Sequence, residues 1–586
     1  MNSRWRQSCA PFRVCYTGSV NPILRAFFRL AVCLLLAGVA AQGVELLSVN
    51  SSGTNSCNAG VGESFCLSAD GRYVAFNSSA TNIVVPDTNG LTDVFVRDCV
   101  LRSNIWGTVD SRGPVGVNGP TPLLFTPDGR FLLFSSLATN LAPNVTNPVI
   151  AQLYRRDLWS NETALVSVAY DGTNASLKTA TAGGMTPDGR FILFTTTATN
   201  IVAGVNSGTS TFAYLRDMLG GSNELITASP GGLVLDRGIG SCYMSTNARY
   251  FAFYVSATNV VPGIANTNGT FQVYWRDRLA GTNTLASVNV DGTFAKDSAV
   301  LTGLTRDGRY VSFNCLSTNI VAGQNDNNGT QDIFIRDIVA GETWLVTRAT
   351  NGNTTGGRVT GGKFSANGEW MMLAPTVADL MPGVQDINSG SPDIYLHHLP
   401  TRTNLLVSRS VSGLTGANGY VADGFATLSA SGRFVVFDTS SINLLPGAPT
   451  AVPRLLLRDC TMSQTLSPLP GAYPTPAYNY GHYVITEDER YVYFLSLGSH
   501  DPTVTDANNN ADLFRARLLP AQLQAPLPGG LIQGEGIALG TYILQTSSNL
   551  TSWFNAVTNI ADSNGVFSVS DPQPPGPQRY FRLKTP

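Results

Sequence analysis

The chain has 586 residues and a formal net charge of −2, so no basic surface argues for nucleic acid or an anionic lipid surface as a partner. Only 13% of residues are charged while 43% are apolar, which excludes an intrinsically disordered chain. The many glycines, serines, threonines and asparagines favour short strands joined by turns.

The first residues form a leader that is typical of a secretory signal. An apolar run over 30–43 contains small residues near its end and follows five arginines, namely Arg4, Arg6, Arg13, Arg25 and Arg29. The run is short for a bilayer span. We therefore predict a signal peptide over 1–41 and a secreted, periplasmic or cell-surface protein without a membrane span in the mature chain. An uncleaved anchor is the alternative.

Six cysteines follow the leader, and none belongs to a C-x-x-C pair. Cys57 and Cys66 are the only two close enough in sequence to suggest a local disulfide. For most of the others we expect small buried apolar side chains, and we expect no metal site built from cysteine.

Eight copies of one motif occupy most of the chain. In its first copy, "SADGRYVAF" from Ser68, a turn is followed by an arginine and a short apolar run. Copies are about 60 residues apart, which indicates a repeat architecture. The residue after the turn is Arg72, Arg130, Arg190, Arg249, Arg309, Glu369, Arg433 and Arg490.

Each copy divides into four predicted strands. Asp-Gly predicts a two-residue hairpin turn in which both central residues have positive φ. The second strand, such as 73–76, is apolar on both faces and must be covered on both. A third strand reads "DVFVRD" from Asp93, and a fourth reads "ALVSV" from Ala164. Radial stacking covers both faces of all eight sheets, so we predict an all-β, eight-bladed β-propeller over 44–520.

The two ends of this region predict how the ring closes. Residues 44–50 resemble a fourth strand, while the last copy supplies only three strands and ends near 512–517. The N-terminal strand is therefore expected to complete the last blade and remove an open sheet edge. Seven blades with one extra unit is the alternative. Beyond the ring we predict a Pro-rich linker at 521–532 and a small β-domain at 533–586.

The pattern S-x-D-G-R-[FY]-[VI]-x-F, followed by D-[VI]-[FY]-[VI]-R-D, resembles the TolB-like, PD40-type (WD40-like) propeller repeat. The resemblance covers about 45–520. It implies the propeller fold, but such propellers include docking proteins, carbohydrate-active enzymes and peptidase gates, so it does not specify a function. The C-terminal segment resembles a small module found on secreted bacterial proteins.

The loops between strands two and three and between strands four and one are long, and both are expected on one face of the ring. We expect a monomeric, non-catalytic protein that binds a protein or glycan partner there. The alternative is a polysaccharide lyase or glycoside hydrolase with acidic residues in the central channel. No catalytic motif is present, so we predict no catalytic residue and no cofactor other than calcium.

Several periodic polar residues have a structural interpretation. Arg-Asp pairs end the third strands, as at 97–98 and 336–337, and Thr-Asn pairs follow the second strands, as at 199–200. One pair per blade favours turn capping and loop fixing over an active site. His397 and His398 occupy the Arg-Asp position of the sixth copy and, as neighbours on a strand, point to opposite faces.

Three loops before third strands share the pattern D-x-N-x-x-x-D. Calcium binds six to eight oxygen ligands from carboxylates, amides and carbonyls, so this pattern predicts calcium sites. No glutamate follows at the twelfth position, and a metal-free Asn-Gly turn is the alternative. The candidate ligands are Asp87, Asn89 and Asp93, then Asp326, Asn328 and Asp332, and finally Asp506, Asn508 and Asp512.

Overall fold

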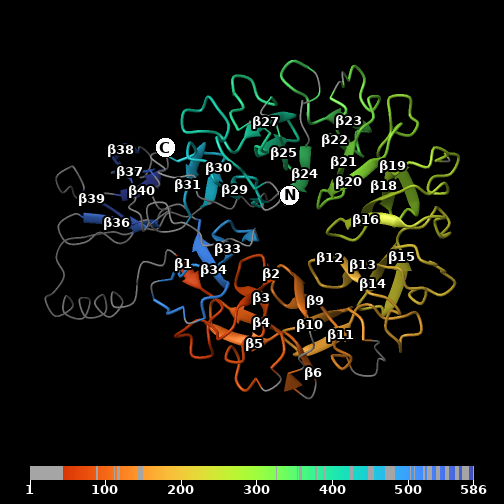
Figure 1. The fold of residues 1–586 in the computed structure, drawn as a ribbon, viewed down its shortest axis with the longest axis horizontal. Helices are drawn as coiled ribbons and strands as arrows, with labels where there is room; N and C mark the ends of the chain where they lie inside the picture. The colour runs from red at the N-terminus through yellow and green to blue at the C-terminus, as the bar shows by residue number, and fades with distance from the viewer. Residues whose placement is uncertain are drawn as a thin grey trace, which may run out of the picture. The chain divides into compact units, whose positions relative to one another are not determined.

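Eight four-stranded antiparallel sheets form the blades of a β-propeller in the computed structural model (Figure 1). The described residues contain strands and turns but no helix, and none of their segments is a helix long and apolar enough to cross a membrane. The structure describes residues 44–584 apart from 88–89, 111–112, 115–118, 143–148, 265, 325, 327, 353, 355–358, 377–378, 389, 423–425, 446–453, 469–481, 502, 507, 519–521, 524–530, 536–540, 548–552, 561–565 and 571–579. The predicted signal peptide at 1–41 lies outside this range.

The first four blades each run outward from the first to the fourth strand of their sequence repeat. Their strands are β2 (Val61–Leu67), β3 (Tyr73–Ser78), β4 (Asp93–Asp98) and β5 (Ser103–Trp106); β8 (Thr121–Phe125), β9 (Phe131–Ser136), β10 (Gln152–Asp157) and β11 (Glu162–Leu165); β12 (Thr181–Met185), β13 (Phe191–Thr196), β14 (Phe212–Asp217) and β15 (Ser222–Leu225); β16 (Ile239–Met244), β17 (Tyr250–Val255), β18 (Gln272–Asp277) and β19 (Thr282–Leu285). A two-stranded hairpin, β6 (Val109–Asp110) with β7 (Gly113–Pro114), lies between the first two blades in sequence.

Blades five to seven follow the same order, and the eighth combines the last three strands of the repeat region with β1. These strands are β20 (Ala299–Leu304), β21 (Tyr310–Cys315), β22 (Asp332–Asp337) and β23 (Glu342–Leu345); β24 (Val359–Phe364), β25 (Trp370–Pro375), β26 (Tyr395–His398) and β27 (Thr403–Leu406); β28 (Thr427–Leu428), β29 (Phe434–Thr439), β30 (Arg454–Asp459) and β31 (Gln464–Leu466); β32 (Tyr483–Ile485), β33 (Tyr491–Ser496), β34 (Asp512–Arg517) and β1 (Val44–Leu46).

The N-terminal strand closes the ring, as predicted. The order in the eighth sheet is β1-β34-β33-β32, and the Leu47 N–H donates to the Leu513 carbonyl at 2.8 Å. In Figure 1, β1 (red) lies beside β34 (blue). The prediction of eight blades is therefore confirmed, and the seven-blade alternative is excluded.

The cores between blades explain why the second strands are apolar on both faces. Val74, Ala75 and Phe76 are all fully buried, although their side chains alternate in direction. Val74 and Phe76 pack in one cluster with Tyr493 and Leu513 of the eighth blade, while Ala75 packs in another with side chains of the second blade. Each sheet is thus covered on both sides by its neighbours.

The turn between the first and second strands differs from our prediction. In the first blade the Gly71 N–H donates to the Ser68 carbonyl at 2.9 Å, and of the turn residues only Gly71, at 67°, has positive φ. The Asp70 carboxylate accepts hydrogen bonds from the Ser68 hydroxyl and the Arg72 N–H. These side-chain bonds fix a longer turn that ends in a left-handed glycine, so the predicted two-residue turn is wrong.

The fourth strands also begin earlier than predicted. In the second blade β11 covers Glu162–Leu165, whereas the apolar pattern had suggested a start at Ala164. Beyond Leu165, the Val166 N–H still donates to the Leu153 carbonyl at 2.8 Å, which continues the same register by one residue. The outer strand of a blade is half exposed, so it can begin with polar residues, and a prediction based on apolar residues misses them.

Residues 516–586 belong to a second compact unit. It contains two three-stranded sheets, β35-β36-β39 and β38-β37-β40. A small core of Ile532, Leu544, Phe567 and Val569 joins them. The strands are β35 (Gln522–Leu523), β36 (Leu531–Glu535), β37 (Thr541–Ser547), β38 (Phe554–Ile560), β39 (Val566–Ser570) and β40 (Tyr580–Lys584), so β35 and the start of β36 fall within the range predicted as a linker.

Candidate cation sites on the long-loop face

The two classes of long loop lie on one face of the ring. Asn200, which follows the second strand of the third blade, donates from Nδ2 to the Ala175 carbonyl at 2.9 Å. Its Oδ1 accepts from the Leu177 N–H at 3.1 Å, and both partners belong to the loop between the second and third blades. Asn259 makes the same pair of contacts one blade later. The Thr-Asn pairs therefore join neighbouring loops.

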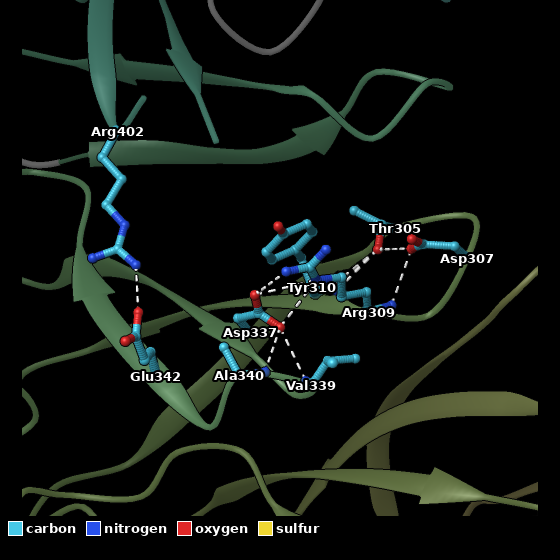
Figure 2. Close-up of polar contacts among 9 residues, drawn as sticks. All are labelled: Thr305, Asp307, Arg309, Tyr310, Asp337, Val339, Ala340, Glu342 and Arg402. Carbon is cyan, nitrogen blue, oxygen red and sulfur yellow. Dashed lines mark hydrogen bonds and ion pairs between the residues drawn. The ribbon is translucent and has the colours of Figure 1, made fainter. Parts of the chain in front are cut away.

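The Arg-Asp pairs are structural, but the two residues of a pair do not bind each other. Asp337 accepts from Arg309, the residue after the turn of the same blade, at 2.7 Å, and its Oδ1 also accepts from the N–H groups of Val339 and Ala340 (Figure 2). Although burial opposes it, bonding to Arg309 and these N–H groups lowers the pKa of Asp337. The same ion pair joins Arg72 to Asp98, Arg130 to Asp157, Arg190 to Asp217, Arg249 to Asp277 and Arg433 to Asp459.

The two adjacent histidines of the sixth blade have different partners. The His397 Nε2 accepts from the Trp344 indole N–H at 3.0 Å, and its Nδ1 lies 2.8 Å from the Asn404 Oδ1. His398 instead contacts the Thr401 hydroxyl. His397 is thus a satisfied neutral side chain between two blades, and the two rings form no shared site.

The strongest candidate for a ligand site lies at the start of β22 in the fifth blade. Asp332 is fully buried, and its Oδ1 accepts from the Thr347 hydroxyl at 2.7 Å. Its Oδ2 is buried too and has no hydrogen-bond partner among the described residues. Burial and the nearby charge of Asp326 raise the pKa of Asp332 to about 7, although bonding to Thr347 and Asn328 opposes the shift. A buried carboxylate with an unsatisfied oxygen therefore lies near the charge of the partly exposed Asp326.

The fourth blade shows how a neutral side chain fills the same position. There the equivalent residue is Gln272, whose Oε1 accepts from the Ser287 hydroxyl at 2.7 Å, as Asp332 accepts from Thr347. Its Nε2, however, donates to the Ala295 carbonyl at 3.0 Å. Gln152 repeats this arrangement in the second blade, with its Nε2 donating to the Ser176 carbonyl at 2.9 Å. An aspartate puts an oxygen where these glutamines have an N–H, and an oxygen there needs a cation or a proton.

The other predicted calcium loops fit less well. In the first blade Asp93 is buried and accepts from Thr108 at 2.8 Å, and Asp87 is described, but Asn89 lies outside the described residues. The eighth blade brings Asp506, Asn508 and Asp512 together, but the Asn508 Nδ2 donates to the Cys57 carbonyl at 2.7 Å and faces the Asp512 carboxylate. An amide N–H thus takes the cation's place there.

No group of three or more His, Cys, Asp or Glu side chains gathers within the described part of the chain. A cation in the fifth blade would therefore rely on two carboxylates together with neutral oxygens, a mixture that calcium accepts. All six described cysteines are free thiols, so Cys57 and Cys66 form no disulfide. Our prediction missed a fourth acidic loop, Asp386 to Asp393, because one extra residue separates its aspartates.

One serine–histidine contact bears on catalysis. Ser496 Oγ lies 2.7 Å from the His500 Nε2, but Ser496 is fully buried. It also accepts from the Gly498 N–H, as Ser136 accepts from the Ala138 N–H at the same place in the second blade. This contact holds a loop and gives no substrate access to the hydroxyl.

No protein-family description and no curated protein matches this chain. Among solved structures, it is similar to a prolyl endopeptidase (10% identity, TM-score 0.37, 71% of this chain and 54% of that one). It is also similar to the β-propeller domain of the Trilobed protease from Pyrococcus furiosus (12%, 0.33, 66% and 92%) and to a puromycin-hydrolyzing peptidase of Mycobacterium tuberculosis (9%, 0.35, 80% and 62%). The chain thus spans less than two thirds of two of these three proteins.

These comparisons correct our functional expectations. The solved structures named above are of peptidases, so we retain neither the non-catalytic protein or glycan binder nor the polysaccharide-active enzyme, and we withdraw the expectation that the protein is not an enzyme. At 9–12% identity the likeness shows the fold alone.

Proposed function

We propose that the protein is a calcium-binding β-propeller whose fifth blade holds the ion between Asp326, Asn328 and Asp332. The observation that carries this proposal is the Asp332 Oδ2, which is buried and without a hydrogen-bond partner among the described residues. A cation there would satisfy this oxygen and offset the repulsion between the two carboxylates.

The ligand chemistry favours calcium over magnesium. The candidate donors are carboxylate and amide oxygens on an irregular loop, and calcium accepts such flexible geometry with additional carbonyls and waters. Magnesium demands a nearly ideal octahedron and gives up its waters reluctantly. By joining the loop to the first residue of β22, the ion would order part of the long-loop face.

Two further inferences agree with this proposal. The repeated motif supports assignment to the TolB-like, PD40-type propellers, and the Arg-rich leader supports secretion. Outside the cell calcium is abundant, and extracellular modules bind it at about 10⁻⁴–10⁻³ M, which suits a site with only two carboxylates. The names of the solved peptidases make peptide hydrolysis the first activity to assay with the calcium-loaded protein.

Calcium titration of the secreted protein, with the ion number read by native mass spectrometry, tests the proposal. We expect Asp332→Asn to bind one calcium fewer than the unmodified protein. It should still fold, because its amide keeps the Thr347 contact and supplies the N–H that Gln272 has. Asp291→Asn, in an exposed loop, is the matched control and should bind the full number. An unchanged number of bound ions in Asp332→Asn would refute the site.

A further inference from the structure

A second buried carboxylate with an unsatisfied oxygen lies just before β26 in the sixth blade. Asp393 is 1% exposed, and its Oδ1 accepts from the Ser408 hydroxyl at 2.5 Å and from the Ala417 N–H at 3.1 Å. Its Oδ2 is buried and finds no hydrogen-bond partner in the part of the chain that the structure describes. One carboxylate oxygen of Asp393 is therefore held firmly, while the other is buried without a partner among the described residues.

The Asp393 carboxylate packs closely against a glycine. A Cβ added at Gly416 would lie 2.5 Å from the Asp393 Oδ2, closer than any side chain tolerates. Gly416 is not among the residues with positive φ, so its backbone conformation does not require glycine. What requires glycine is the approach of the carboxylate.

Oxygen atoms converge on the neighbouring loop as well. One end of the Asn388 amide lies 2.7 Å from the Asp386 Oδ1 and 3.2 Å from the Ser391 carbonyl oxygen. If that end is the nitrogen, the amide donates two hydrogen bonds. If it is the oxygen, three oxygens face one another, as the ligands of a cation do. The two ends have the same shape, so a bound ion would decide between them.

We propose that Asp386, Asn388 and Asp393 form a second calcium site, with the Ser391 carbonyl and water completing the oxygen ligands. The order is that of the fifth blade, an aspartate, an asparagine two residues later and a buried aspartate at the third strand, but the last spacing is one residue longer. The site extends the proposed function, yet it rests on residues of its own. The competing explanation for the open oxygen is a proton on Asp393.

The test is a calcium titration of four proteins, with ions counted by native mass spectrometry: the unmodified chain, Asp393→Asn, Asp332→Asn and the double variant. We expect each single variant to lose one ion and the double variant to lose two. If Asp393→Asn keeps the full number while Asp332→Asn loses one, the second site is wrong and the proposed function stands. If only Asp393→Asn loses an ion, the proposed site in the fifth blade is wrong and this one stands. Full retention in both refutes both.

A second variant tests the same site in case Asp393→Asn does not fold. Asn388 lies on a partly exposed loop, so Asn388→Ala should fold and should weaken calcium binding at this site at least tenfold. Terbium in place of calcium should compete for the same sites, whereas magnesium at equal concentration should not displace calcium. An unaltered calcium affinity in Asn388→Ala would overturn the proposal.

Discussion

Arg515 and Glu45 form an ion pair although 470 positions separate them in the chain, with the guanidinium Nε 2.7 Å from the carboxylate Oε2. Their side chains are only 13% and 15% exposed. Beside them the Tyr493 hydroxyl donates to the Gly71 carbonyl of the first blade. The pair therefore lies where the ring closes, and it joins β1 to β34 by more than backbone hydrogen bonds.

Removing one member of this pair should destabilise the ring strongly. Glu45→Gln leaves the buried Arg515 without its countercharge, which typically costs about 3–5 kcal/mol. Glu487→Gln breaks the exposed pair between Glu487 and Arg306, whose side chains are 40% and 49% exposed, and should cost at most about 1 kcal/mol. Urea denaturation of the two variants compares these costs. Equal losses would show that the closure does not depend on the ion pair.

His397 should make the stability of the ring depend on pH. Burial lowers the pKa of His397 from 6.5 to about 4, with smaller contributions from the charges of His398 and Arg402 and against the hydrogen bond to Asn404. The Nε2 that would take the proton already accepts from the Trp344 indole. Between pH 6.5 and 4 the unfolded chain binds a proton that the folded ring does not, so stability falls as the pH decreases. Full development of this effect is worth about 3 kcal/mol.

Comparison of unfolding free energies at pH 7 and pH 4.5 isolates this group. His397→Gln should lose less stability than the unmodified protein over that interval. His482, which is exposed, provides the control: His482→Gln should behave like the unmodified protein. A pH dependence that persists in full in His397→Gln would contradict the assignment.

With EDTA present, placing an acid at the fourth-blade position and an amide at the fifth-blade position should change the thermal stability of the protein in opposite directions. Gln272→Glu removes the donor to the Ala295 carbonyl and should cost about 1–3 kcal/mol. The Asp332 Oδ2 has no hydrogen-bond partner among the described residues. Asp332→Asn replaces it with an N–H donor and should stabilise the metal-free protein. Thermal melts of both variants measure this. A shift in the same direction for both would argue against the comparison between the two blades.

Two variants of Asp337 should separate its two contacts. Asp337→Asn loses the ion pair to the half-exposed Arg309 but keeps an oxygen for the N–H groups of Val339 and Ala340, so we expect a loss of about 1 kcal/mol. Asp337→Ala loses both contacts and should cost about 2 kcal/mol. Equal losses in urea denaturation would mean that the turn does not depend on this carboxylate.

The repeat made the architecture predictable because each copy repeats the same apolar pattern. The second strands, with residues such as Val74 and Phe76, are apolar on both faces, which indicates that both faces are buried. A segment resembling a fourth strand precedes the first copy, and this indicated how the ring closes. Details that depend on side-chain hydrogen bonds were harder to predict. The turn at Gly71 is set by the Asp70 carboxylate, which a turn rule based on backbone angles ignores.

The candidate sites, too, were predictable from the sequence only in part. Three acidic loops were found by their fixed spacing, but the loop from Asp386 to Asp393 was missed because one inserted residue breaks that spacing. Sequence alone also could not rank them. Only the structure shows that the buried Asp332 Oδ2 lacks a hydrogen-bond partner among the described residues and that the Asn508 amide fills the equivalent place in the eighth blade.

The pairing of β1 with β34 also constrains how the protein is made. The first strand of the ring to leave the ribosome has its partner at the very end of the repeat region, so it stays unpaired while the other blades are synthesised. Bringing the two together across some 470 residues costs about 4 kcal/mol more chain entropy than closing a four-residue turn. Throughout synthesis the nascent chain thus carries a bare strand edge, which makes this a protein whose folding should benefit from a holdase.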